Sequence, residues 1–251
     1  KAVPEATFAS GTFSTSHVGY SCSVPPGSYD ATSSPLDVVY TYRAPSGGAL
    51  VKRYRFAPDT YDYQMVIEVT GREKLGFERQ YELTWSNPLG VTEPEPTGDY
   101  EAMEAVAMMS GSREKLADFE DGKLNQSLTG STSWTGIRAK YFSAVLIPRN
   151  RVADGVFARG TSAIVQTPDG PVEKRLITAG MEFPFELSSS FADTFTVFVG
   201  PLDYTLMADY QVGLQDMLDI GTTPYVGWII KPFALAIIWL LPNMYSVVPN
   251  Y

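Results

Sequence analysis

The chain has 251 residues, 44% of them hydrophobic, with 19 basic against 28 acidic side chains and a formal net charge of -9 at pH 7. Its single cysteine, Cys22, and single histidine, His17, exclude an intramolecular disulfide framework and a structural zinc site, which needs about four Cys or His ligands. Nucleic-acid binding is disfavoured because it depends on Lys and Arg clusters, and the richest basic stretch, Lys52-Arg53-Tyr54-Arg55, fits the solvated face of a strand.

The first third of the chain is predicted to form antiparallel strands separated by Pro- and Gly-rich turns. The clearest strand is Tyr61–Thr70, in which apolar and polar residues alternate as they do when one face of a strand is buried. Similar β-branched, aromatic or alternating runs occupy residues 38–43, 49–56 and 77–85. This spacing is typical of a sandwich or a barrel.

The middle of the chain is less regular. The segment Tyr100–Met109 has the composition of a good helix former, yet it also fits a strand whose Ala and Met side chains face the interior. It follows a Pro-rich acidic loop at residues 92–99. The residues alone leave the choice between helix and strand open.

More strands are expected in the second half. The run Trp134–Ile147 ends in a β-like stretch before Pro148, and Phe191–Val199 is the last clear strand. Residues 155–166 and 172–178 are expected to pair around Thr167-Pro168-Asp169-Gly170, where Pro and Gly suit a tight turn.

The character of the sequence changes after Gly200-Pro201. Asp203 is expected to cap a helix that spans residues 204–219, because its apolar residues recur every three or four positions. Gly221-Thr222-Thr223-Pro224 would end this helix.

From Tyr225 to the C-terminus the only charged residue is Lys231. The unbroken apolar run, residues 233–241, is about half the length of roughly 20 residues that a transmembrane helix needs. It is bounded by Lys231-Pro232 and Pro242-Asn243. A complete membrane span is therefore not expected, and a short core helix or a helix at the membrane surface both fit.

Aromatic residues favour the membrane surface, because Trp and Tyr prefer the headgroup zone and a Lys can extend its amine toward water. The helix lacks a strongly polar face, so it would need cover from protein or from further membrane segments. The candidate membrane-interface residues are Trp228, Lys231, Phe233, Ile237, Trp239 and Tyr245.

Catalytic and metal-binding motifs are weak. Cys22 lacks a basic neighbour that would activate it, and Asp118–Gly122 lacks the alternating oxygen ligands of a calcium loop. The abundant aromatic residues could line a sugar or peptide site, but in a sandwich they usually pack between sheets. The paired carboxylates are expected in solvated loops: Glu93/Glu95, Glu101/Glu104 and Asp118/Glu120/Asp121.

An ordered series of short motifs resembles the YidC family of bacterial membrane-protein insertases, and the likeness is strongest from Trp134 to Tyr251. The motifs are residues 134–142 (WTGIRAKYF), 198–204 (FVGPLDY), 212–214 (VGL) and 227–232 (GWIIKP). Within them, we expect structural roles for Trp134, Gly136, Tyr141, Phe142, Gly200, Pro201, Asp203, Tyr204, Gly227 and Pro232.

The resemblance implies a mainly β fold, namely a β-supersandwich of antiparallel sheets with C-terminal α-helices. Residues 1–202 would form the periplasmic domain, with an N-terminal part that looks short for the family. Residues 203–222 would form a helix packed on the sandwich, and residues 223–251 a short apolar interfacial helix leading toward a transmembrane segment. The resemblance also favours a strand for Tyr100–Met109.

The resemblance implies a non-catalytic domain of an insertase and chaperone, on the periplasmic side of the inner membrane. It would need no cofactor or metal, and its partners would be membrane-protein substrates, the Sec translocon and the bilayer surface. No signal peptide is visible, so export is expected to depend on a segment before Lys1. Two alternatives stay open: a carbohydrate-binding or sugar-epimerase-like supersandwich, by fold analogy, and a secreted adhesion module.

Overall fold

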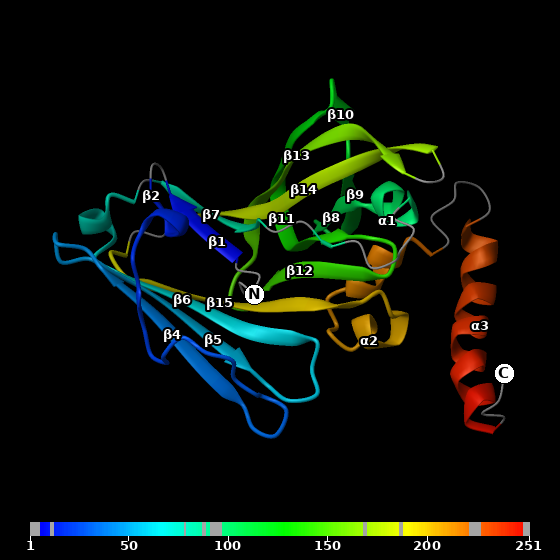
Figure 1. Ribbon diagram of the computed structural model, residues 1–251, viewed down its shortest axis with the longest axis horizontal. Coiled ribbons are helices and arrows are strands. Elements are labelled where there is room, and N and C mark those ends of the chain that lie inside the picture. The colour runs from blue at the N-terminus through cyan, green and yellow to red at the C-terminus, as the bar shows by residue number, and fades with distance from the viewer. Residues whose placement is uncertain are drawn as a thin grey trace. The chain divides into compact units, whose positions relative to one another are not determined.

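The computed structural model describes residues 6–10, 13–77, 79–86, 89–90, 97–167, 170–185, 188–220 and 227–247. The chain divides into two compact units, Lys1–Pro201 and Leu202–Tyr251. The first unit is built almost entirely of strands, and the second contains helices (Figure 1). The prediction of a mainly β fold with few helices is confirmed.

The described strands of the first unit form one antiparallel ladder in the order β2-β1-β7-β14-β13-β11-β12-β15-β6-β5-β4-β3, with β8, β9 and β10 attached through β11. The strands are β1 (Ala6–Ser10), β2 (Phe13–Ser14), β3 (Ser21–Cys22), β4 (Leu36–Arg43), β5 (Ala49–Phe56), β6 (Asp62–Thr70), β7 (Gln80–Trp85), β8 (Glu104–Met109), β9 (Ser112–Leu116), β10 (Phe119–Glu120), β11 (Lys123–Arg138), β12 (Phe142–Pro148), β13 (Ala153–Thr167), β14 (Gly170–Pro184) and β15 (Phe191–Pro201). Short helical segments of this unit are η1 (Thr15–His17), η2 (Arg72–Leu75) and α1 (Thr97–Ala102).

The ladder folds over itself so that distant strands face each other. Phe183 on β14 and Phe195 on β15 are separated by three strands in the ladder, yet their ring centroids lie 5.5 Å apart. Both side chains are fully buried. Burying one large apolar side chain stabilises a fold by about 1.5–3 kcal/mol, so this aromatic interior is what holds the two layers of the sandwich together.

The period-two pattern of residues 61–70 correctly predicts a half-buried strand. Tyr63, Met65, Ile67 and Val69 on β6 are all buried, whereas Tyr61 precedes the strand and is 53% exposed. The predicted strands at 38–43, 49–56, 77–85 and 191–199 correspond to β4, β5, β7 and β15, with small shifts at their ends.

Residues 100–109 combine both of the structures between which the sequence left a choice. Helix α1 ends at Ala102, and strand β8 begins at Glu104 and is buried along its whole length. The expectation of a strand throughout is therefore wrong for its first four residues, three of which are helical. Helix propensity decides the exposed end of the segment, and pairing of β8 with β9 and β11 decides the rest.

The predicted hairpin of residues 155–178 is confirmed and is longer than expected. β13 and β14 pair without interruption from Gly155↔Glu182 to Thr167↔Gly170. The expected turn residues Pro168 and Asp169 lie outside the described residues. The run Trp134–Ile147 is not one strand, because it contains the end of β11, a turn closed by a hydrogen bond from Ala139 N to Phe142 O, and most of β12.

The second unit contains α2 (Tyr204–Ala208), the 3₁₀ helix η3 (Leu214–Leu218) and α3 (Gly227–Val247). Asp203 caps α2 as predicted, since its Oδ1 accepts a hydrogen bond from Leu206 N at 2.8 Å. The expectation of one helix over 204–219 is wrong. Gln211 and Gly213 both have positive φ values, 57° and 71°, which no continuous α-helix tolerates.

Candidate functional site

The residues predicted to contact a membrane all belong to α3, in the second unit. Lys231, Phe233 and Ile237 are exposed, while the side chains of Trp228, Trp239 and Tyr245 lie outside what the structure describes. The helix spans 21 residues, so it is longer than the apolar run from which it was expected. It continues through both Pro232 and Pro242, each of which omits one backbone hydrogen bond.

Large apolar side chains form a stripe along α3. They follow one another at intervals of three and four residues, which places them on one face of a helix. The stripe consists of Ile230, Phe233, Ile237, Leu240 and Met244, which are between 45% and 67% exposed.

Lys231 lies on the side of α3 opposite this stripe, since successive helical residues are about 100° apart. Its Nζ is 3.9 Å from Asp216 Oδ1 of η3, and both side chains are partly exposed, so the pair adds little stability. In the described part of the chain, no helix combines the length and the hydropathy needed to cross a bilayer.

Two of the motif residues taken from the resemblance lie in the core of the sandwich. Trp134 on β11 is fully buried. Gly136, two residues later, lies so close to β12 that a Cβ there would be 2.4 Å from the backbone oxygen of Ala144. The segment therefore requires a large side chain at Trp134 and no side chain at Gly136.

The remaining motif residues lie at the ends of strands β12 and β15 and in or beside the helices α2 and α3. A Cβ on Gly200 would be 2.8 Å from atoms of Phe198 and Tyr61. Pro201 pairs with Phe142 in the ladder. Of the others, Tyr141 and Phe142 are more than 40% exposed, Asp203 and Tyr204 begin α2, Gly227 begins α3, and Pro232 is exposed within it.

Glu104 contradicts the prediction that the paired carboxylates lie in solvated loops. Its side chain on β8 is 5% exposed and lies among three cations from neighbouring strands. Arg113 is 3.1 Å from it and Arg138 2.6 Å, and the amine of Lys115 also contacts it. Glu101, Asp118, Glu120 and Asp121 are exposed as predicted. Glu101 belongs to α1 and Glu120 to β10, however, so these two do not lie in loops. Glu93 and Glu95 lie outside the described residues.

A second buried charge, which the sequence did not reveal, is Lys52 on β5. Only 1% of the residue is exposed, and its Nζ lies 4.9 Å from the centroid of the Tyr20 ring. Burial lowers the pKa of this amine to about 8, because an ammonium group loses its hydration in the interior. The basic stretch 52–55 is thus half buried, with Lys52 and Tyr54 inside and Arg53 and Arg55 in solvent.

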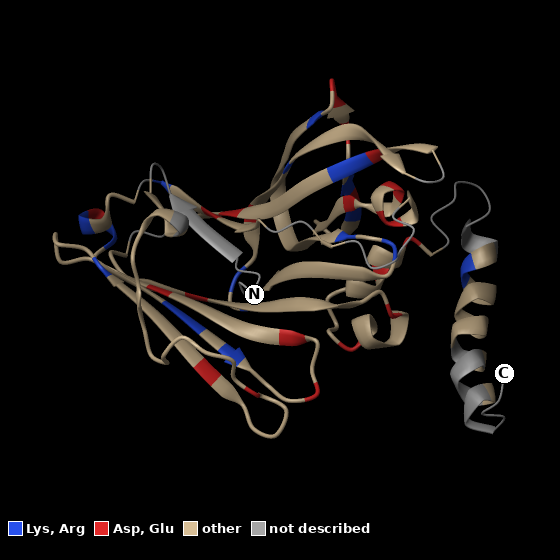
Figure 2. Ribbon diagram, viewed as in Figure 1, with Lys and Arg blue, Asp and Glu red and all other residues tan. Residues whose placement is uncertain are grey.

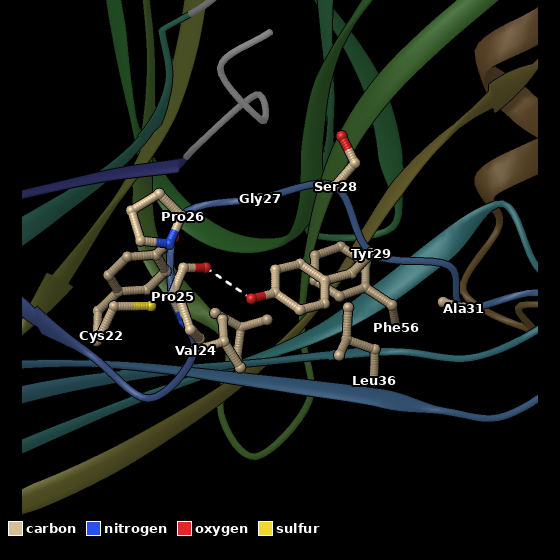
Figure 3. Close-up of a pocket in the computed structure, with 12 residues that line it drawn as sticks. Cys22, Val24, Pro25, Pro26, Gly27, Ser28, Tyr29, Ala31, Leu36 and Phe56 are labelled. Carbon is tan, nitrogen blue, oxygen red and sulfur yellow. Dashed lines mark hydrogen bonds between the residues drawn. The ribbon is translucent and has the colours of Figure 1, made fainter.

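The first unit also contains a cavity of about 650 Å³ between a loop and one end of a sheet (Figure 3). The loop, residues 24–31, forms the roof, and the side chains of β4 and β5 form the floor (Figure 3). The lining residues are Cys22, Val24, Pro25, Pro26, Gly27, Ser28, Tyr29, Ala31, Leu36, Val38, Tyr40 and Phe56.

The lining of this cavity is mainly apolar, with Tyr40 and Cys22 among its few polar groups. Burial raises the pKa of the Tyr40 hydroxyl, and the neighbouring Cys22 raises it further. Cys22 is exposed and reduced. None of the twelve lining residues carries a formal charge at neutral pH, so the cavity lacks the carboxylate and histidine that a sugar epimerase would need.

The sequence pattern did not point to this cavity, because its roof has no periodicity. The Pro25-Pro26-Gly27 segment followed by Tyr29 was the available signal, since it predicts a stiff loop carrying an aromatic side chain. His17 is exposed at the end of η1. Among the described residues, no cluster of three or more His, Cys, Asp or Glu side chains is arranged to hold a metal ion.

A family model described as the YidC periplasmic domain matches residues 11–236 of the chain. A protein named membrane protein insertase YidC, from Chlorobaculum tepidum, is 30% identical over 222 residues, which are 86% of this chain and 35% of that protein. One of the same name from Syntrophus aciditrophicus is 25% identical over 234 residues, which are 92% of this chain and 40% of that protein. The chain thus spans little more than a third of the length of these relatives.

Among solved structures, the α-N-acetylgalactosaminidase NagBb from Bifidobacterium bifidum aligns with 85% of this chain and 33% of its own. The TM-score is 0.46 and the sequence identity is 10%.

Proposed function

Because the chain belongs to the family of YidC periplasmic domains, we propose that it is the non-catalytic, periplasmic part of a membrane-protein insertase and that it assists membrane-protein clients during insertion and folding. The observation that carries this proposal is the family match over residues 11–236. The uncharged cavity and the exposed apolar stripe on α3 fit a role in binding rather than in catalysis.

Within this role, α3 would lie along the bilayer surface. Its five exposed apolar side chains would enter the acyl boundary, and Lys231 on the opposite face would remain in the water or headgroup layer. A helix with this arrangement binds in proportion to the apolar area that it buries. The second unit would thereby hold the sandwich near the site of insertion.

Flotation with phosphatidylcholine vesicles tests the membrane-surface role. The full chain is expected to float, and a chain truncated after Gly221 is expected to remain at the bottom. A Phe233→Glu/Ile237→Glu variant should bind at least about tenfold more weakly, because burial of each side chain contributes about 1.5–3 kcal/mol.

Lys231→Glu is the matched control, since it also introduces a carboxylate on α3 but on the face opposite the stripe. It should float like the unmodified chain. Equal failure of the full and truncated chains to float, or equal loss in both Glu variants, would contradict the membrane-surface role of the stripe.

We further propose that the domain works beside the Sec translocon. The support is the family membership alone. Co-purification of Sec components with the full-length insertase, with and without the segment that corresponds to this chain, tests it. Unchanged recovery without the segment would show that the contact lies elsewhere in the protein.

A further inference from the structure

The cavity beneath the 24–31 loop has a chemistry that limits what can occupy it. None of its twelve lining residues is Asp, Glu, Lys, Arg or His. A phosphate, carboxylate or ammonium group would therefore enter without a charged partner, at a large desolvation cost. The floor is made of Leu36, Val38 and Phe56, which offer apolar contacts. The ligand must be apolar over the part that enters.

The roof is held in place without a ligand. Pro25 and Pro26 fix their own φ angles, and the Tyr29 hydroxyl donates a hydrogen bond to the Pro25 carbonyl oxygen at 2.7 Å (Figure 3). Further along, Thr32 N donates to Asp30 Oδ1 at 2.8 Å. Since the cavity is formed in advance, binding would not have to order this loop.

The cavity opens beside an incompletely covered strand edge. β3 pairs with β4 only at Thr41 and Tyr40, followed by a hydrogen bond from Ser23 N to Val39 O and one from Val39 N to Ser23 Oγ. The backbone of Val39 therefore faces the outer edge of β4. The backbone N–H and C=O of Asp37, two residues earlier, point toward the same outer edge. The residue is exposed.

Beyond Ser23 the chain leaves this edge to form the roof of the cavity (Figure 3). Within the described residues, no strand pairs with the outer edge of β4 at residues 36–38. A guest strand placed there would continue the line of β3. Its alternate side chains would lie on the same face as Leu36 and Val38, which is the face that lines the cavity.

We infer that the cavity and this edge form one binding site for an extended polypeptide segment with uncharged, apolar side chains at alternate positions. Main-chain pairing at Asp37 fixes the segment, and the cavity takes its side chains. An acyl chain could fill the cavity but could not use the strand edge, which favours polypeptide as the occupant. The inference rests on the proposed client-binding role and specifies the chemistry of the client segment.

Cys22 provides the measurement, because it is the single cysteine of the chain, is exposed and lines the cavity. The probe is a peptide of roughly ten residues, with leucine and valine at alternate central positions and two lysines at each end. On the full chain, this peptide should slow alkylation of Cys22 by a maleimide in a saturable way. A peptide with serine in place of leucine and valine should leave the rate unchanged.

A pair of variants at Asp37 separates edge pairing from simple filling of the cavity. Asp37→Pro removes the outward N–H on an edge strand, where proline is tolerated, and should weaken the peptide at least about tenfold. Asp37→Ala also removes the ion pair with Arg55 but keeps the N–H, and should bind like the unmodified chain. Thermal melting verifies that both variants are folded.

Failure of the apolar peptide to protect Cys22 would overturn the inference. Equal protection of Cys22 by the peptide in the proline and alanine variants would overturn it as well. If decanoic acid then protects Cys22 at a lower concentration than the peptide, the cavity is an acyl-chain site. Vesicle flotation does not involve Asp37, so it should be unchanged in both variants. Failure of the peptide-binding inference can therefore be distinguished from failure of the membrane-surface role.

Discussion

The hydroxyl of Tyr81 on β7 donates a hydrogen bond to the carboxylate of Asp193 on β15, across the interior of the sandwich. The two residues are 112 positions apart in sequence, and their strands belong to opposite parts of the folded ladder. Arg151 donates to the same carboxylate oxygen at 2.8 Å. Burial raises the pKa of Tyr81 well above its usual value, so the hydroxyl keeps the proton that it donates.

We expect Tyr81→Phe to lower the free energy of unfolding by about 1–3 kcal/mol, because a buried carboxylate loses one of its donors. Urea denaturation measures this change. Tyr141→Phe is the matched control, since the same hydroxyl is removed from a side chain that is 44% exposed, and its unfolding midpoint should stay the same. Equal effects of the two substitutions would argue against the cross-layer bond.

Glu104→Gln should be more damaging. The substitution leaves Arg113 and Arg138, which are both mostly buried, without the carboxylate between them. Removal of one partner from a buried ion pair costs about 3–5 kcal/mol. Chemical denaturation should show this loss for Glu104→Gln and no significant change for Glu101→Gln, whose side chain is exposed. A similar midpoint for both variants would mean that the cluster is not held together by Glu104.

Lys52 should make the stability of the chain depend on pH in the alkaline range. Its pKa falls from 10.5 to about 8 on folding, so between these values the unfolded chain binds more protons. Stability therefore rises as the pH increases from about 8 toward 10.5. At pH 7 the buried ammonium costs about 3 kcal/mol, from a shift of about 2.5 pKa units at 1.36 kcal/mol per unit.

Lys52→Met should accordingly be more stable than the unmodified chain at neutral pH, and its advantage should shrink by about pH 9.5. Unfolding free energies at the two pH values give the comparison. Lys123→Met, at an exposed position, controls for the loss of one positive charge. An advantage of Lys52→Met that is the same at both pH values would falsify the assignment of the effect to Lys52 titration.

Gly136→Ala tests the close approach of β11 and β12. The added Cβ would lie 2.4 Å from the Ala144 carbonyl oxygen and 2.9 Å from Val145 Cα, and backbone atoms cannot move aside as a flexible side chain can. We expect a loss of about 1–3 kcal/mol, or a melting temperature lower by roughly 2–12 °C. Gly19→Ala, where nothing lies within 4 Å of the new Cβ, should melt like the unmodified chain.

Local patterns in the sequence determined most of the elements. The alternation in residues 61–70 identified the buried face of β6 from Tyr63 to Val69, because neighbouring side chains of a strand point to opposite faces. Asp203 was recognisable as a helix cap, since capping involves only the next three residues. The family resemblance of the second half was likewise visible in short ordered motifs.

Tertiary structure alone decided which polar groups are buried and where a cavity lies. Glu104 contacts Arg113 on β9 and Arg138 on β11. The amine of Lys52 is shielded from solvent by the ring of Tyr20, which lies in the segment between η1 and β3. The cavity likewise depends on a loop that crosses β4 and β5. A local sequence window encodes periodicity and capping, whereas burial depends on pairing between strands that are distant in sequence, which no local window contains.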